Sequence, residues 1–258
     1  MHRYANLGAR LLHLRHHPRK RIHWLGAAFA AARRLRRRKE EAGHLGNLGV
    51  AYKILGQIPR AVRLHEQALA VARELSDRAL EGINLGNLGN AHMELGEMEL
   101  AIEFYQRRLV IARELGDQLG EENALGNLGL AHARIGETRS AIEFHEQALI
   151  IARETGNRWG EGHALGSLGE SYAALGEMER AIEFYEQRLA IARKLGDKRG
   201  EGNGLWNVAK ALHKLGECSH AIAHAETALK ILEQIEHPNA AKVSKQIGEW
   251  AVEKMTGA

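Results

Sequence analysis

Asparagine residues recur at a fixed interval in this chain, and the chemistry of their side chains suits one task well. Asn47, Asn87 and Asn127 are 40 residues apart, and Asn207 continues the series after Ser167 interrupts it. A carboxamide carries both donors and an acceptor, so it can pair with a peptide backbone whatever side chains that peptide has. The other role open to these residues is a hydrogen bond to a neighbouring helix of the same chain, which buried polar groups usually make.

Cationic residues accompany the asparagines. Asn90 follows Asn87 by three residues, so the two share one face of a helix. Four cations fall on the same stretches of the repeat: Lys53, Arg134, Lys210 and Lys214. Their charge would add attraction for an acidic segment of a partner protein.

Metal binding and catalysis have weaker support in the sequence. Cys218, His220 and His224 lie close together, but a fourth ligand and the known zinc spacings are missing. Cys218 falls where earlier repeats have Met98 and Met178, which favours a place in the core. No Ser-His-Asp or Cys-His arrangement is indicated, and the many carboxylates recur at repeated surface positions. We therefore expect no metal site, no cofactor and no enzymatic activity.

The helices that carry these residues follow from the spacing of apolar side chains. In residues 83–96, Leu85, Leu88, His92 and Leu95 fall at i, i+3, i+7 and i+10, which places them on one face of a helix. Gly96 follows directly, as glycine often does at the end of a helix.

A second helix is expected immediately afterwards. Its apolar face comprises Ala101, Ile102, Tyr105, Leu109 and Ala112; Gly116 ends it, and Asp117 is placed to cap the next helix. The chain contains only 3 prolines, and no alternating runs rich in Val, Ile and Thr suggest a sheet. Each 40-residue unit is therefore predicted to be a pair of helices.

Glycine recurs inside the first helix of each pair, although it costs roughly 1 kcal/mol relative to alanine there. Gly89 lies beside the apolar stripe, and its equivalents are Gly49, Gly129, Gly169 and, in the fifth copy, Ala209. We expect these positions to let the second helix approach closely, with small residues opposite small ones: Ala61, Ala101, Ala141, Ala181 and Ala221. A nucleotide-binding loop is not expected, because no strand precedes the glycines.

A longer period of 80 residues is superimposed on the first. Repeats that begin near residues 43 and 123 contain HEQAL, whereas those near 83 and 163 contain YQRRL and YEQRL. We interpret this alternation as an inherited duplication without a function of its own.

Together these residues resemble the tetratricopeptide repeat. Leu85, Leu88-Gly89, His92, Ala101 and Tyr105 are spaced like the bulky residue, Leu-Gly, Tyr, Ala and aromatic positions of that repeat. The late proline of the family is replaced by arginine, which lets the second helix run on and fits a period of 40 rather than 34; these arginines are Arg73, Arg113, Arg153 and Arg193. The 40-residue form is similar to Pins/LGN-type and bacterial tetratricopeptide scaffolds, although no G-protein-regulatory motif is seen.

The resemblance implies an all-α fold, namely an α-solenoid in which antiparallel helix hairpins form a right-handed superhelix. Its concave groove is expected to bind a protein or an extended, acidic peptide across residues 43–202, because in this family the first helix of each hairpin lines the groove. The groove residues implied for this chain are Asn47, Asn87, Asn90, Asn127, Asn207, Lys53, Arg134, Lys210 and Lys214.

The period also divides the chain. Residues 1–42 are expected to form a basic, degenerate N-terminal repeat or cap, and residues 243–258 a C-terminal capping helix. The capping helix has an apolar stripe of Val243, Ile247, Ala251 and Met255. Five repeats lie between them: 43–82, 83–122, 123–162, 163–202 and 203–242.

The N-terminal segment is strongly basic. Residues 1–39 hold ten Arg and two Lys and no acid, so the remainder of the chain is net acidic although the whole carries +4. RIHWLGAAFAAARRLRR (21–37) aligns with a second helix of the repeat, which explains it better than an export signal does. We interpret it as a basic cap; the alternative is a segment that associates with nucleic acid or another anionic surface.

The remaining composition indicates the compartment. A single cysteine, Cys218, fits a reducing environment, and no run approaches the roughly 18 apolar residues of a membrane span. We therefore expect a cytoplasmic protein whose partner is a protein or peptide rather than nucleic acid.

Overall fold

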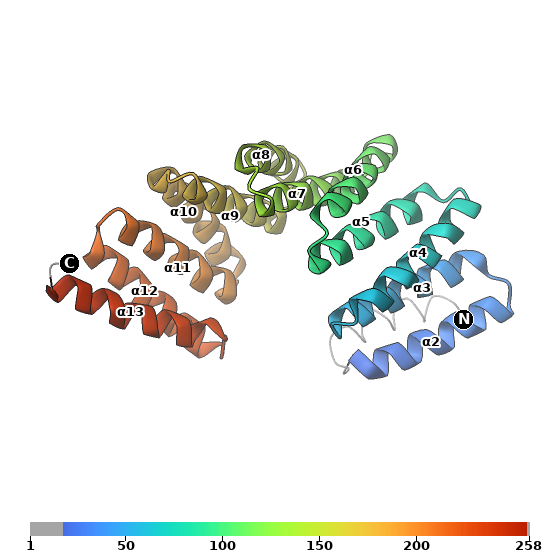
Figure 1. Ribbon diagram of the computed structural model, residues 1–258, viewed down its shortest axis with the longest axis horizontal. Helices are drawn as coiled ribbons and strands as arrows, with labels where there is room; N and C mark the ends of the chain where they lie inside the picture. The colour runs from blue at the N-terminus through green and yellow to red at the C-terminus, as the bar shows by residue number, and fades with distance from the viewer. Residues whose placement is uncertain (1–17, 257–258) are drawn as a thin grey trace. The chain divides into compact units, whose positions relative to one another are not determined.

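The computed structural model describes residues 18–256 of the 258-residue chain. These residues form twelve α-helices and no strand, which confirms the predicted all-α solenoid of helix hairpins (Figure 1). The first part of the predicted basic segment, residues 1–17, and the side chain of Met255 lie outside the described residues. In chain order the helices are α2 (Pro18–Arg34), α3 (Arg38–Ile54), α4 (Ile58–Glu74), α5 (Arg78–Leu95), α6 (Met98–Leu115), α7 (Gln118–Arg134), α8 (Thr138–Glu154), α9 (Arg158–Ala174), α10 (Met178–Leu195), α11 (Lys198–Lys214), α12 (Cys218–Gln234) and α13 (Asn239–Thr256).

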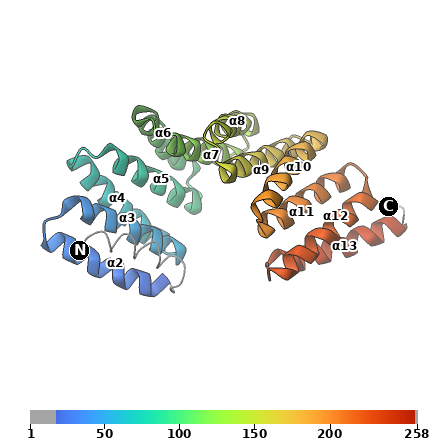
Figure 2. The same cartoon turned by 180° about the vertical axis from the view of Figure 1, so that it is seen from behind.

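The chain forms two compact units, residues 1–127 and 128–258, with the boundary inside α7. In the first unit α3 pairs with α4 and α5 with α6, while α2 packs on α3 and α5 on α4. In the second unit α9 pairs with α10 and α11 with α12, and α13 packs on α12 (Figure 2). The first helices α5, α9 and α11 therefore each pack on the second helix of the hairpin before them.

Helices α5, α6 and α7 begin or end at a capping residue or glycine predicted from the sequence. Gly96 and Gly116 end α5 and α6 in the left-handed conformation, with φ of 83° and 64°. The Asp117 carboxylate accepts a hydrogen bond of 2.9 Å from the backbone N–H of Gly120, so it caps α7 as expected. Asp77 caps α5 in the same way, at 3.0 Å from the N–H of Leu80.

Most residues of the predicted apolar faces are buried in the core. Leu85, Leu88 and Tyr105 are completely buried. Leu95, expected on the same stripe as Leu85, is instead 43% exposed. It is the last residue of α5, where the helix ends at Gly96 and no longer has a neighbour to cover that face.

The recurring glycines make room for rings rather than for small residues. The nearest atoms to the absent Cβ of Gly89 belong to the Tyr105 ring, at 2.5 Å, and those nearest Gly49 belong to the His65 ring, also at 2.5 Å. The expectation of small opposite small was therefore wrong about the contact, although Ala61 and Ala101 are fully buried. Gly129 meets His145 and Gly169 meets Tyr185 in the same way. A side chain at these glycines would overlap a packed ring.

The observed helix starts differ from the repeat boundaries drawn from the sequence. The first helices begin at Arg38, Arg78 and equivalent residues, five positions before the repeat boundaries drawn from the sequence. At the C-terminus α13 begins at Asn239, four positions before the predicted start of the capping helix. Val243 of its apolar stripe is fully buried, and so, at 3% exposure, is Trp250, which the stripe did not include. Trp250 stacks on Trp206 of α11, with ring centroids 5.4 Å apart.

Candidate peptide-binding site

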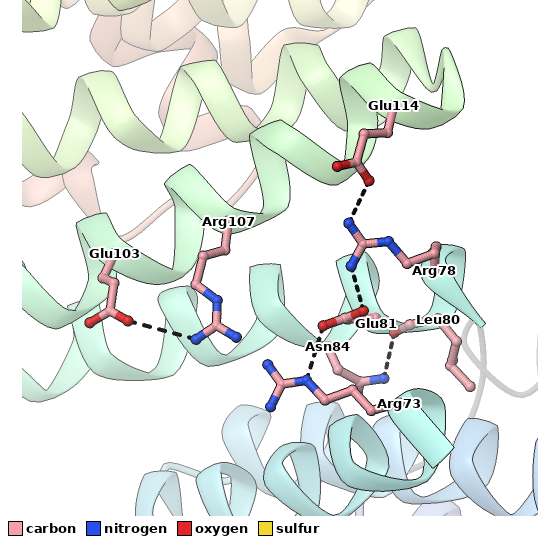
Figure 3. A network of polar contacts seen from close by, with 8 residues as sticks. All are labelled: Arg73, Arg78, Leu80, Glu81, Asn84, Glu103, Arg107 and Glu114. Carbon is pink, nitrogen blue, oxygen red and sulfur yellow. Dashed lines mark hydrogen bonds and ion pairs between the residues drawn. The ribbon is translucent and has the colours of Figure 1, made fainter. Parts of the chain in front are cut away.

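A polar network around Glu81 in the first unit holds helices together. The Glu81 carboxylate, on α5 and only 9% exposed, accepts hydrogen bonds of 3.0 Å from Arg73 Nε and 2.8 Å from Arg78 Nη1 (Figure 3). Burial alone would raise the pKa of Glu81, but the two guanidinium groups outweigh it and lower the pKa below its usual value. Arg78 also pairs with Glu114 of α6. The carboxylate therefore stays charged and ties α4, α5 and α6 together.

This network recurs along the chain through the arginines that stand where the family has proline. Arg113 Nε lies 2.7 Å from Glu121, and Arg193 Nε lies 3.0 Å from Glu201. Arg153 pairs with Glu161 at 3.1 Å. In each case the second helix of one hairpin is joined to the first helix of the next. These groups are occupied with holding neighbouring hairpins together and offer no site for a ligand.

The predicted asparagines lie in three kinds of surroundings. Asn47, Asn87 and Asn127 are half-buried on α3, α5 and α7. Asn90 is engaged within its own hairpin, because its Oδ1 accepts a hydrogen bond of 2.8 Å from the Tyr105 hydroxyl. Asn207, on α11, is 9% exposed and lines a cavity.

The predicted cations are also divided. Lys53 forms an ion pair with Glu94 of α5, with Nζ 3.2 Å from the carboxylate. Arg134 is the last residue of α7. Lys210 and Lys214 both lie on α11 and are exposed. Lys210 lines the same cavity as Asn207, so the structure brings together two of the nine predicted residues at one place.

That cavity lies wholly within the second unit and has a volume of about 290 Å³. First helices α9, α11 and α13 supply most of its lining, and the second helix α10 supplies one arginine. Its polar residues are three cations, three carboxamides and one acid, beside one aromatic ring: Arg188, Lys210, Lys242, Asn203, Asn207, Asn239, Glu170 and Trp206. Three positive charges face a single carboxylate, so the cavity has a net positive charge.

The electrostatics of Lys210 reflect this concentration of charge. Its ammonium lies 5.9 Å from the centre of the Trp206 ring. Although water reaches the side chain, the surrounding protein removes part of its hydration, and this desolvation lowers the pKa of Lys210. Lys242 and Lys214 lower that pKa further, whereas Glu170 opposes the change. A bound anion would relieve the repulsion among these cations.

The sequence interpretation missed most of this lining, although it contained signals for part of it. The sequence placed Arg188 only within the YEQRL segment of the alternating repeats and gave it no role at a site. The structure places it against Gly166, whose absent Cβ would lie 2.6 Å from Arg188 Nη1, so the glycine leaves room for the guanidinium. Trp206 replaces the small residue found at Gly166 and Gly126 in earlier copies, which is a visible break in the repeat. Asn239 and Lys242 lie in α13, outside the repeat pattern used to find the asparagines.

Two further properties of residues 18–256 bear on the kind of protein. His, Cys, Asp and Glu side chains there form no group of three that could hold a metal ion, and Cys218 is a free, half-buried cysteine. None of the helices in that range has both the length and the apolar character needed to cross a bilayer.

Solved structures with a similar fold come from several kinds of protein. BtubC (BKLC) from P. vanneervenii is 22% identical over 87% of this chain and 95% of its own, with a TM-score of 0.76. A signal-transduction ATPase of the STAND class with a tetratricopeptide repeat sensor, from Pyrococcus horikoshii, is 20% identical over 88% of this chain and 33% of its own, with a TM-score of 0.75. A Rap protein complexed with competence and sporulation factor is 16% identical over 92% of this chain and 71% of its own, with a TM-score of 0.64. At these identities the likeness concerns the fold.

The repeat itself is recognised in the sequence over most of its length. No curated protein sequence matches the chain. Profiles described as tetratricopeptide repeat, however, match residues 42–78, 79–154 and 161–234. With the helix hairpins and glycine positions described above, these matches show that the chain belongs to the tetratricopeptide repeat family.

Proposed function

We propose that this chain is a non-enzymatic scaffold that binds another protein, and that the cavity of the second unit receives an acidic segment of that partner. The observation that carries the proposal is the gathering of Arg188, Lys210 and Lys242 with three asparagines in one cavity of about 290 Å³. Carboxamides and cations together suit an extended peptide, whose backbone and carboxylates need both kinds of partner.

The side chains that line the cavity can make different contacts with an acidic peptide. Arg188 can hold a carboxylate with two parallel N–H donors, while Lys210 supplies a more compact charge. Asn203 and Asn207 lie four residues apart on α11, hence on one face, and can pair with the backbone amides of the peptide. The Trp206 ring offers an apolar surface beside them.

The size of the cavity limits what enters it. Pockets that enclose drug-sized molecules have volumes of roughly 300–1,000 Å³, so about 290 Å³ suits one or two side chains rather than a folded domain. The rest of the partner would lie along the surfaces of α9, α11 and α13. The Rap structure, described as a complex with competence and sporulation factor, provides a precedent for a bound factor on a similar fold.

Fluorescence anisotropy with a labelled decapeptide rich in Glu and Asp tests the proposal. Replacing Arg188 or Lys210 by Ala should each weaken binding about tenfold, because a hydrogen bond to a charged group contributes about 1.5–3 kcal/mol. Lys53→Ala is the matched control: Lys53 is a predicted groove cation, but it lies in the first unit and pairs with Glu94. If the acidic peptide does not bind the parent protein, or if Lys53→Ala weakens binding as much as Lys210→Ala, the assignment to this cavity is wrong.

In the first unit, we propose a supporting role for the half-buried carboxamides of Asn47, Asn87 and Asn127 as backbone partners of a bound peptide. Their half-buried positions on first helices support this. Replacing Asn87 and Asn127 together by Ala should weaken partner binding by about 1–3 kcal/mol without loss of helical content, because peptide groups would be left unpaired. Unchanged binding, or loss of the fold, would favour the internal hydrogen-bonding role instead.

A further inference from the structure

The outer face of α2 is a surface that the proposed peptide site does not use. We define this face by six exposed residues that fall within about 120° of the helix circumference at 100° per residue: Lys20, His23, Trp24, Ala27, Ala30 and Arg34. Trp24, near its middle, is 62% exposed. Lys20 and Arg34 stand near its two ends, about 21 Å apart along the axis at 1.5 Å per residue.

The opposite face of α2 accounts for the apolar residues that a stable helix needs. Leu25 is buried in a cluster with Leu48 and Ala51 of α3, and Ile22 and Phe29 pack against that cluster. Figure 1 shows α2 beside α3 in the first unit. Trp24 therefore does not complete the core, because the core side of α2 is already formed by other residues.

The cations on and beside this face are not used in the fold. Arg38 contacts Glu41 and Glu74, and Lys39 contacts Asp77. Residues 18–39 contain no acid. Among the described residues, no carboxylate lies within ion-pair distance of six cations, which form two groups around the ends of α2: Arg19, Lys20, Arg33, Arg34, Arg36 and Arg37.

We propose that the outer face of α2 binds the surface of a membrane that contains anionic phospholipids. Clusters of four to eight Lys and Arg on a helix attract anionic headgroups, and Trp is favoured at the depth where headgroups meet acyl chains. The centre of the face consists of Trp24, Ala27 and Ala30 with one polar residue, His23, and the cations flank it. That order matches a lipid interface, in which phosphates surround an apolar layer.

A nucleic acid fits the same face less well. Base readout needs several donors and acceptors along the centre of the helix face, where this helix has only His23 and Trp24 beside two alanines. Binding to the sugar-phosphate backbone needs cations along the whole length, whereas here they gather at the ends. No helix among residues 18–256 could span a bilayer, so the contact we propose is one of surface adsorption.

Vesicle sedimentation with the full chain tests this proposal. Vesicles of phosphatidylcholine containing phosphatidylserine should sediment the protein, and vesicles of phosphatidylcholine alone should not. Lys20→Glu with Arg34→Glu should lower binding at least about 20-fold, since each cation near such a surface contributes a factor of about five. Trp24→Ala should lower it severalfold and abolish the blue shift of tryptophan emission on binding.

The second unit supplies matched controls. Trp159 is 55% exposed on α9, and Arg139 and Lys230 are exposed cations of α8 and α12. Trp159→Ala and the pair Arg139→Glu with Lys230→Glu should bind vesicles as the parent does. The proposal is overturned if phosphatidylserine does not increase binding, if Trp24→Ala binds like the parent, or if the controls lose as much as the α2 variants. Binding of a labelled single-stranded oligonucleotide without binding of vesicles would assign the face to nucleic acid instead.

Discussion

Two hairpins of the first unit, α3–α4 and α5–α6, place different rings against the same glycine position. In α3–α4 the ring is His65, packed on Gly49; in α5–α6 it is Tyr105, packed on Gly89. Both rings are completely buried. The difference lies in their polar atoms, and it shows how a repeat can exchange one core side chain for another.

The tyrosine hairpin satisfies its polar atom and the histidine hairpin does not. The Tyr105 hydroxyl donates to Asn90, whereas the position equivalent to Asn90 in α3 is Val50. Neither ring nitrogen of His65 makes a hydrogen bond of good geometry among the described residues, although Asn84 lies close enough to favour the charged ring. Burial dominates, and it lowers the pKa of His65 to about 4. The imidazole is therefore neutral at physiological pH.

The same alternation of residue types is found in the second unit. His145 goes with Leu130, Tyr185 with Glu170, and in the last hairpin alanines occupy both the glycine and the ring positions, as Ala209 and Ala225. The ring and the residue that could meet its polar atom change together. The 80-residue period of HEQAL and YQRRL therefore coincides with an alternation of the ring that packs on the glycine.

The largest effect is expected from removing a ring. Tyr105→Ala should lower the free energy of unfolding by about 3–5 kcal/mol, because it leaves a cavity beside Gly89. Gly89→Ala should cost about 1–3 kcal/mol, because its Cβ would lie 2.5 Å from the ring. The double variant recreates the pair Ala209–Ala225. It should lower the free energy of unfolding by less than the sum of the losses in the two single variants. Urea denaturation followed by circular dichroism measures all three; additive costs would show that the two residues do not share one packing position.

Lowering the pH should have an intermediate effect on the free energy of unfolding. The pKa of His65 and of His145 is lowered from 6.5 to about 4 by burial, so the unfolded chain binds the proton first as the pH falls. The stability that each neutral histidine contributes is present above about pH 6.5 and is lost as the pH falls. The loss is about 1.4 kcal/mol per histidine by pH 5.5 and about 3 kcal/mol per histidine below about pH 4. His65→Phe should remove about one proton from the slope of stability against pH in this window. A slope for His65→Phe equal to that of the parent protein would contradict the comparison.

A smaller effect should follow from exchanging the rings. His65→Tyr places a hydroxyl beside Val50, whose side chain cannot form a hydrogen bond. The change should lower the free energy of unfolding by about 1–3 kcal/mol. Adding Val50→Asn reproduces the tyrosine–asparagine pair of the α5–α6 hairpin. The double variant should therefore recover most of the lost stability. Val50→Asn alone measures the cost of the new carboxamide. Thermal unfolding of the three variants measures these stabilities. If the double variant is no more stable than His65→Tyr, the hydrogen bond to Asn90 is not what stabilises the buried Tyr105.

Most of the fold could be predicted from local patterns. The 40-residue period, Gly96, Gly116 and Asp117 specify where helices begin and end, because capping depends on neighbouring residues alone. The contact between Gly89 and Tyr105 could not be predicted in the same way. It depends on how one helix is rotated against another, and the spacing of apolar residues left both Ala101 and Tyr105 as candidates.

The candidate site was predictable only in part. Asn207 and Lys210 were found because they occupy repeated positions on a first helix. Arg188 reaches the cavity from a second helix, and Lys242 from the capping helix, so neither shares the 40-residue register of the asparagines. Conversely, Asn90 and Lys53 shared the expected positions but are held by Tyr105 and Glu94 within the fold. A position in the repeat identifies a helix face, whereas the neighbours of each side chain decide whether it can meet a ligand.

The most direct test of the proposed function is a charge reversal in the cavity. Lys210→Glu combined with Lys242→Glu should weaken binding of the Glu- and Asp-rich decapeptide at least about tenfold and create binding of a Lys-rich decapeptide that the parent protein does not bind. Anisotropy titrations at one salt concentration compare the four combinations. An inverted preference would support the account of the cationic cavity as the site for an acidic partner. Unchanged affinity for the acidic peptide in the charge-reversed protein would contradict it.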